Sequence, residues 1–228
     1  MQVTLFIAGT DTEAGKTYVS CGLLQAFNKM GWSTLGIKPV ASGCARSGGR
    51  LNNPDTRQLQ QASSLQLPHE AVTPFAFEPP VSPNIAAMLD GRALTVTQIN
   101  RKLRNTLACP AAARIIEGCG GWHTPLNDRE TMADFVMANR FPVLLVVGIR
   151  LGCLNHSLLT VRSMLQEQAN VVGWIANCVT PEMLRHKENI AYLQRCLPVP
   201  CAGVIGHGAR PEDAIDLGTI LNRLRRTE

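Results

Sequence analysis

The stretch from residue 3 to residue 17, VTLFIAGTDTEAGKT, constrains the fold more than any other part of the sequence. It begins with an apolar run typical of a buried strand, continues through a turn bounded by Gly9 and Gly15, and leads into an amphipathic helical pattern at Lys16 and Thr17. Backbone N–H groups in such a turn, at the start of a helix, form a cradle for phosphate oxygens. Threonine stands where a strict G-x-x-x-x-G-K-[ST] motif has its first glycine. The pattern still predicts a nucleotide-phosphate site, with Lys16 on the terminal phosphates and Thr17 on Mg²⁺.

Length and composition favour one domain over residues 1–228, because 45% of the residues are hydrophobic and 17% are charged. The longest apolar run, Phe141–Ile149, has the length of a buried strand and predicts no membrane span. The N-terminus lacks the pattern of a secretory signal, so we expect a cytoplasmic protein. The net charge of +5 includes an arginine cluster at the C-terminus that fits a solvated helix end, and we expect no nucleic-acid partner. The eight cysteines are scattered and show no zinc-ligand spacing.

Strand and helix patterns alternate along most of the chain. This alternation predicts an α/β fold with a doubly wound, mostly parallel sheet covered by helices on both faces, as in P-loop NTPases. The expected strands are Val3–Ala8, Thr34–Pro39, Ala113–Glu117, Pro142–Val147, Val171–Ala176 and Ala202–Ile205. The expected helices are Lys16–Met30, Thr56–Ala62, Val96–Leu107, Thr131–Asn139, Asn155–Gln168, Pro181–Cys196 and Pro211–Arg225. The exception is Val40–Asp90, an excursion rich in Gly, Pro, Ser and Asn, and loops of that length are usually functional or mobile.

Polar residues follow several of these strands at the edge where open α/β sheets bind ligands. Lys38 ends the second strand and could neutralise charge on a phosphoryl group, although a lysine there is by itself more typical of a surface position beside a proline turn. Glu117 directly follows a buried strand and precedes a glycine-rich turn, as a metal-organising acid would. Asp55 is the other candidate Mg²⁺ carboxylate, although alone it would be typical of a helix N-cap. Asn177 could contact a purine edge or serve only as a turn residue.

In order along the chain, these segments resemble the dethiobiotin synthetase family over nearly the whole sequence. The resemblance is weakest in about the last 30 residues. It rests on G-T-D-T-E-A-G-K-T at 9–17, K-P-V-A-S-G at 38–43, N-x-P-D ending at Asp55, E-G-C-G-G-W at 117–122, P-L-N-D at 125–128, V-V-G-I-R-L-G-C-L-N-H at 146–156 and G-W-I-A-N at 173–177.

The resemblance implies a ligase of biotin biosynthesis that works as a homodimer. In the family reaction, 7,8-diaminopelargonate, CO₂ (or bicarbonate) and ATP give dethiobiotin, ADP and phosphate by way of a carbamate and a carbamic–phosphoric anhydride. The resemblance assigns catalysis to Lys38 and Lys16, with Mg²⁺ held by Thr17, Asp55 and Glu117. Its implied substrate contacts are Thr12, Ser42, Gly152, Cys153 and Asn155, the last three contributed by the partner subunit to the distal carboxylate. Its implied ATP contacts are Glu13, Ala14, Gly15, Lys16, Thr17, Tyr18, Asp55, Glu117, Gly118, Cys119, Gly120, Asn177, Cys178, Gly206, His207, Gly208 and Glu212.

The chain departs from the family pattern at three places. Cys119 stands where the family commonly has alanine, and a thiol there makes the turn oxidisable. Cys178 stands where aspartate often follows the asparagine, and Gly206–Gly208 replaces a stretch that often carries proline and an aromatic residue. The last two departures concern the nucleobase, so base selectivity is expected to be loose.

Two other functions share the phosphate-binding signature. A partition-type P-loop ATPase carries an extra lysine where this chain has Asp11. A non-catalytic nucleotide-binding paralogue would bind ATP without turnover, but both lysines and both carboxylates are present here.

Overall fold

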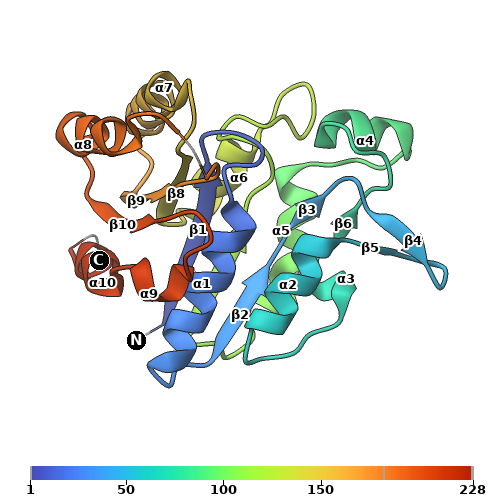
Figure 1. The fold of residues 1–228 in the computed structure, drawn as a ribbon. Helices are drawn as coiled ribbons and strands as arrows, with labels where there is room; N and C mark the ends of the chain where they lie inside the picture. The colour runs from blue at the N-terminus through green and yellow to red at the C-terminus, as the bar shows by residue number, and fades with distance from the viewer. Residues whose placement is uncertain (1, 182, 227–228) are drawn as a thin grey trace.

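The computed structural model describes residues 2–181 and 183–226. Its main feature is a six-stranded sheet in the order β10-β9-β8-β1-β7-β2, in which every neighbouring pair is parallel (Figure 1). The strands are β1 (Val3–Gly9), β2 (Thr34–Ile37), β7 (Ala113–Glu117), β8 (Val143–Gly148), β9 (Val171–Asn177) and β10 (Cys201–Ile205). The expected doubly wound sheet is therefore confirmed, and no strand end differs from the expectation by more than two residues.

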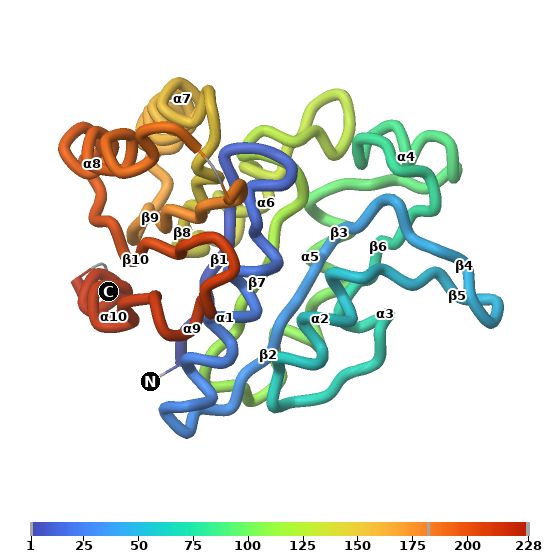
Figure 2. Tube along the Cα trace, viewed as in Figure 1, coloured from blue at the N-terminus to red at the C-terminus, as the bar shows by residue number. Residues whose placement is uncertain are grey.

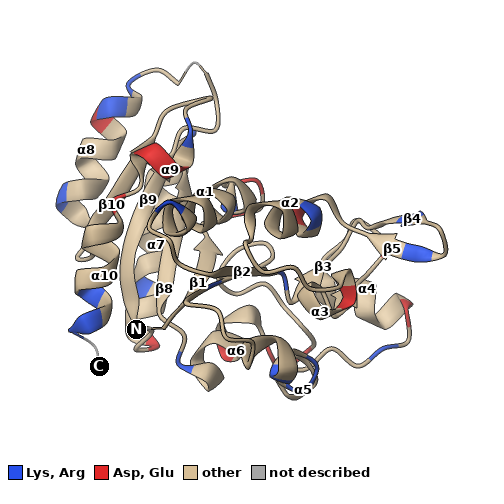
Figure 3. Cartoon of the chain, turned by 90° about the horizontal axis from the view of Figure 1, so that it is seen from below, with Lys and Arg blue, Asp and Glu red and all other residues tan. Residues whose placement is uncertain are grey.

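Helices cover both faces of this sheet, and the strand sequences explain why. Consecutive residues of a strand point to opposite faces, so a strand that is buried on both sides is apolar throughout. Leu5 and Ile7 pack in one core with Leu23 and Phe27, whereas Phe6 packs in the other, which includes residues of the helices on the opposite face. Figure 3 shows α1 and α2 on one side of the sheet and α5 and α6 on the other, with basic and acidic residues spread over many elements.

Along the chain the longer helices lie between strands of the sheet, except the last one, which follows β10. They are α1 (Lys16–Lys29), α2 (Pro54–Ala62), α5 (Val96–Leu107), α6 (Met132–Asn139), α7 (Cys153–Gln166), α8 (His186–Cys196) and α10 (Leu217–Arg225). None of the helices in the described part of the chain is both long and apolar enough to cross a membrane.

Two of the expected helices are shorter or divided. The expected helix Pro181–Cys196 begins only at His186, because Arg185 before it takes a left-handed conformation with φ of 60°; part of that expectation, residue 182, lies outside the described residues. The expected helix Pro211–Arg225 is interrupted, since Ile215 forms an antiparallel bridge with Gly203. The chain therefore makes a short α9 (Pro211–Ala214) and restarts at α10, where Asp216 caps the backbone N–H of Thr219.

The excursion Val40–Asp90 contains more regular structure than the sequence predicts. Its short strands β3 (Val40–Ala41) and β6 (Phe75–Ala76) pair in parallel, and β4 (Ala45–Ser47) and β5 (Arg50–Asn52) form an antiparallel hairpin. The excursion also contains the helices α3 (His69–Val72), which contacts α2, and α4 (Pro83–Leu89). These elements are too short to produce a clear hydrophobic period, which is why they escape prediction.

The topology places the first loop at a reversal of strand order. In the order of strands, the connection after β1 leads to β2 on one side of β1, whereas the connection after β7 leads to β8 on the other side of β1. Ligands of open α/β sheets bind outside the carboxyl ends of the strands at such a point. Figure 2 shows the dark blue loop after β1 at the same end of the molecule as the segments that follow β2 and β7.

Candidate active site

The loop between β1 and α1 encloses the ammonium group of Lys16. Lys16 Nζ donates to the backbone oxygen of Asp11 at 2.9 Å and to that of Gly120 at 2.7 Å. A Cβ atom on Gly9 would lie 2.9 Å from this Nζ, and one on Gly15 would lie 2.0 Å from Asn177 Nδ2, so neither position accepts a side chain without displacement. Burial, with the nearby charge of Lys38, lowers the pKa of Lys16 to about 8.

Lys38 lies at the end of β2 and is buried, not on the surface beside its proline turn. Its Nζ lies 2.5 Å from Glu117 Oε1 and 3.3 Å from Asp55 Oδ2. Glu117 ends β7, which is paired with β2, so the sheet itself brings the two side chains together. Burial alone would lower the pKa of Lys38, but the carboxylates of Glu117 and Asp55 raise it above its ordinary value. Lys38 therefore keeps its positive charge in the buried cleft.

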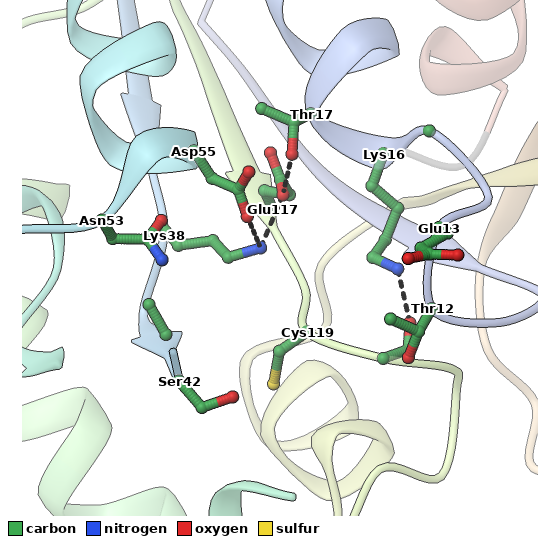
Figure 4. Close-up of a pocket in the computed structure, with 13 residues that line it drawn as sticks. Thr12, Glu13, Lys16, Thr17, Lys38, Ser42, Asn53, Asp55, Glu117 and Cys119 are labelled. Atoms are coloured by element: carbon green, nitrogen blue, oxygen red, sulfur yellow. Dashed lines mark hydrogen bonds and ion pairs between the residues drawn. The ribbon is translucent and has the colours of Figure 1, made fainter. Parts of the chain in front are cut away.

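Lys16 and Lys38 line the same cleft of about 290 Å³, and Figure 4 shows them on opposite sides of it. The cleft brings together the phosphate loop, the end of β2, the start of α2 and the turn after β7. Its lining residues are Thr12, Glu13, Gly15, Lys16, Thr17, Lys38, Ala41, Ser42, Asn53, Asp55, Glu117, Cys119 and Gly120. Most of the residues expected at the triphosphate and at the reacting end of the substrate thus meet in one place. Three others do not line the cleft. Ala14 is buried, and Tyr18 lies on α1 after Thr17. Gly118 contacts Lys38 through its backbone oxygen, 3.2 Å from Lys38 Nζ.

Three oxygen donors in this cleft have the chemistry of a magnesium site. Thr17 Oγ1 donates to Glu117 Oε1 at 2.8 Å, and Asp55 lies across Lys38 from them. Glu117 is 1% exposed, and within the described part of the chain its Oε2 has no hydrogen-bond partner. A buried carboxylate oxygen without a hydrogen-bond partner lowers the stability of the fold unless a cation binds to it. Among residues 2–181 and 183–226, no cluster of three or more His, Cys, Asp or Glu could hold a metal alone, so phosphate oxygens would have to complete the coordination.

The turn after β7, residues 118–121, is here called the glycine loop. A Cβ atom on Gly118 would lie 2.7 Å from the Phe6 ring, and one on Gly120, whose φ is +59°, would lie 2.2 Å from Thr124 Oγ1. The glycines therefore let the backbone pass close to β1 and to the phosphate loop. Burial raises the pKa of the Cys119 thiol in this loop, although the neighbouring lysines act in the opposite direction.

Two polar residues near the cleft were not predicted as site residues. Asn53 is buried and caps α2, accepting from the backbone N–H of Thr56 at 3.2 Å. Asp55, which alone would be typical of an N-cap, instead lies in the first turn of α2 and faces Lys38. The sequence Asn53-Pro54-Asp55 indicates this arrangement, because proline is favoured at the first position of a helix.

Arg150 is the second residue that was not predicted. It follows β8 and donates to Asp11 Oδ2 at 2.5 Å, so it links the phosphate loop to the segment after β8, the strand paired with β1.

The residues expected at the nucleobase lie beside the phosphate loop but do not line the cleft. Asn177 is buried, and its Nδ2 donates to the backbone oxygen of Ala14 at 3.0 Å. Glu212 Oε1 is paired with Arg210 at 2.6 Å. Two hydrogen bonds connect these segments. The backbone N–H of Cys178 donates to the oxygen of Ile205 at 2.9 Å, and the side-chain hydroxyl of Tyr18 donates to the backbone oxygen of Ala209. Residues 206–208 form an exposed turn just before Ala209.

The residues expected at the distal carboxylate of the substrate lie at the start of α7, outside the cleft. Cys153 is buried, and its backbone N–H donates to the oxygen of Arg150 at 3.0 Å. Gly152 and Asn155 are exposed there, next to Leu151, whose exposed fraction is 94%. None of the three expected residues lines the chain's own phosphate cleft.

Comparison with known proteins agrees with the family and with the fold that the sequence predicts. A family model described as an AAA domain matches residues 3–209. The ATP-dependent dethiobiotin synthetase BioD 1 of Salmonella typhi is 46% identical over 200 residues, which cover 88% of this chain and 87% of that protein. BioD 1 of Escherichia coli strain K12 is 44% identical over 215 residues, which cover 94% of this chain and 95% of that protein.

Among solved structures, chloroplast FtsY from Physcomitrella patens is similar with a TM-score of 0.56 and 18% sequence identity. The match covers 98% of this chain and 65% of the FtsY chain, and at this identity it concerns the fold alone. The range matched by the family model, residues 3–209, includes the phosphate loop, the glycine loop and the strands that carry Lys38 and Glu117. The chain belongs to the ATP-dependent dethiobiotin synthetase family.

Proposed function

We propose that the cleft between the phosphate loop and the end of β2 joins 7,8-diaminopelargonate, CO₂ and ATP to give dethiobiotin, ADP and phosphate. As a member of its family, the chain is an ATP-dependent ligase of biotin biosynthesis. The observation that carries the assignment of this site is the placement of Lys16 and Lys38 on two sides of one cleft beside Glu117 and Asp55. In the family reaction, one amine of the substrate captures CO₂ as a carbamate, whose oxygen attacks the γ-phosphorus as ADP leaves. The second amine then attacks the carbamate carbon, releasing phosphate and closing the ring.

Both transfers build negative charge in a confined space, so cations in fixed positions are what the reaction needs. Lys16 would leave the oxygens of Asp11 and Gly120 and bind the β- and γ-phosphates, keeping its proton there because the phosphates favour the ammonium form. Lys38 would face the carbamate and the γ-phosphate, already charged and already oriented by Glu117 and Asp55. Thr12, Ser42 and Glu13 line the mouth of the cleft, where they would contact the reacting end of the substrate and the phosphates.

Thr17, Asp55 and Glu117 would hold Mg²⁺ together with phosphate oxygens. When bound, the ion would neutralise charge on the triphosphate. The unpartnered Oε2 of Glu117 supports this assignment, and so does the orientation of the Thr17 hydroxyl toward the same carboxylate. Hard oxygen donors of this kind are those that Mg²⁺ prefers.

We further propose that the enzyme works as a homodimer in which the start of α7 binds the distal carboxylate of the diamine in the partner's cleft. Three large apolar side chains along α7 and just before it, Leu151, Leu159 and Leu165, are 94%, 57% and 42% exposed, as at a surface that another chain covers. Gly152 and Asn155 are exposed at the helix start, where backbone N–H groups favour an anion.

The nucleobase would lie beside Asn177, Cys178, the turn 206–208 and Glu212, whereas Tyr18 would belong to the residues that wrap the phosphates. Asn177 already fixes the loop through Ala14, which leaves its amide oxygen for the base. All eight cysteines are free thiols, which fits a reducing compartment, and we assign the reaction to the cytoplasm.

Release of ADP distinguishes this function from that of a nucleotide binder. Purified protein with ATP, Mg²⁺ and bicarbonate should release ADP only when 7,8-diaminopelargonate is added. ADP release that is absent, or that is independent of the diamine, would contradict the proposal.

A further inference from the structure

The glycine loop contacts both lysines of the cleft through its backbone. The oxygen of Gly118 lies 3.2 Å from Lys38 Nζ, and that of Gly120 lies 2.7 Å from Lys16 Nζ. Cys119, between them, lines the cleft. A displacement of this loop would therefore move the hydrogen-bond acceptors of both ammonium groups at once.

The residues that follow the glycine loop are held by the C-terminal end of α7. Trp122 is buried, and its indole Nε1 donates to Glu167 Oε2 at 2.9 Å. The other carboxylate oxygen, Oε1, accepts from Ser163 Oγ at 2.9 Å and lies 2.9 Å from His123 Nε2. His123 Nε2 also lies 2.7 Å from Ser163 Oγ. We call Trp122, His123, Ser163 and Glu167 the loop anchor.

Glu167 is unfavourably placed for the helix that carries it. It is the residue at the C-terminal end of α7, where the helix dipole favours a cation and disfavours a carboxylate. Its contacts instead serve the loop, because the Trp122 ring packs in the core and its N–H needs an acceptor there. The carboxylate thus stabilises the exit of the loop at some cost to its own helix.

We propose that Glu167 is a positioning residue, which holds the glycine loop through Trp122 so that the backbone oxygen of Gly118 keeps Lys38 in register with the transferred phosphoryl group. The inference rests on the proposed role of Lys38. It predicts that losing the anchor affects the rate of the chemical step more than the binding of ATP, since the phosphate loop and Thr17 remain in place.

The test compares Glu167→Ala, which removes the acceptor for Trp122, with Glu167→Gln, whose amide oxygen keeps it. Because small displacements of catalytic groups lower rates steeply, we expect Glu167→Ala to reduce kcat about tenfold, with KM for ATP changed less than about twofold. Glu167→Gln should recover most of the lost kcat. Glu188→Ala, which removes an exposed glutamate on α8, is the matched control. Rates are normalised to folded protein by circular dichroism at the assay temperature.

A double-mutant cycle with Trp122→Phe, which keeps a smaller aromatic ring and removes the N–H, tests whether Glu167 acts through the indole N–H. The combined Trp122→Phe/Glu167→Ala variant should be no slower than the slower single variant. Wild-type kcat in folded Glu167→Ala, equal losses in the Ala and Gln variants, or additive effects in the cycle would each overturn the inference. Lys38→Ala in the same assay separates the two proposals: if it turns over normally the proposed lysine role fails, whereas if it is inactive and Glu167→Ala is normal, only the anchor fails.

Discussion

The most consequential residue-level feature is a lysine whose charge depends on its surroundings. Lys16 has a pKa lowered to about 8 by burial and by Lys38, so a growing fraction of the free protein carries neutral Lys16 above that pH. The unfolded chain binds this proton more tightly, so the contribution of Lys16 to folding stability rises with pH between about 8 and its unperturbed pKa of about 10.4. Phosphate oxygens favour the ammonium form, so binding of ATP above pH 8 should take up a proton.

Calorimetry of ATP binding at about pH 9, in buffers of different ionisation enthalpy, measures that proton directly. Lys16→Arg is the matched control, since a guanidinium stays charged and should bind ATP without proton uptake. A binding enthalpy of the unaltered protein that does not depend on the buffer would contradict the expectation.

The two carboxylates around Lys38 should differ in their effect on stability. Glu117→Ala removes a buried partner of Lys38 and should cost about 3–5 kcal/mol of the free energy of unfolding. Asp55 has a side chain that is 35% exposed, and Asp55→Ala should cost about 1 kcal/mol or less. Urea unfolding of both variants measures the two free energies. Equal losses in the free energy of unfolding would contradict the expectation that Glu117 stabilises the buried charge of Lys38 more than Asp55 does.

The sequence predicted which residues follow the strands but not how their side chains meet. Lys38 and Glu117 could be predicted because Lys38 directly follows a buried strand and Glu117 ends another, and parallel strands end at one edge. The contact between Lys16 and the oxygen of Gly120 spans 104 residues, and the one between Trp122 and Glu167 spans 45. No local pattern carries such information, because these contacts depend on how far each loop folds back.

At the scale of elements, the N-terminal cap of α2 should influence the site. Asn53 satisfies the N–H of Thr56, and Asp55 faces Lys38 from the first turn of that helix. We expect Asn53→Ala to lower the free energy of unfolding by about 1 kcal/mol and Asn53→Ser, which keeps a capping oxygen, to cost less. Thermal unfolding of the two variants measures this, and an Asn53→Ser variant as unstable as Asn53→Ala would show that the cap is unimportant.

The elements of the sheet were predicted well because long, doubly buried strands leave continuous apolar runs such as Val143–Gly148. Errors fell where a single residue decides the geometry. The left-handed Arg185 delays α8, and the bridge from Ile215 to Gly203 divides the last helical stretch. Neither residue type carries a local signal for that conformation.

At the scale of the whole molecule, the proposed homodimer can be tested by complementation. Lys38→Ala disables a cleft, whereas Asn155→Asp places a like charge beside the carboxylate bound in the partner's cleft and should raise KM for the diamine far more than KM for ATP. If the site is shared, a mixed dimer of the two variants holds one intact cleft, and random mixing should restore about a quarter of the unaltered activity. Refolding the variants together and assaying at low diamine concentration gives the result. Activity that equals the sum of the separate variants would exclude a shared site.

The central claim is that Lys38 stabilises the phosphoryl group while it passes from ATP to the carbamate. Its most direct test is incorporation of ¹⁴C-bicarbonate into acid-stable product by the unaltered protein and by Lys38→Ala, with ATP affinity measured on the same samples. The account predicts that Lys38→Ala loses at least about a hundredfold in incorporation and binds ATP with an affinity within a small factor of the unaltered protein. Near-normal incorporation by folded Lys38→Ala would contradict it.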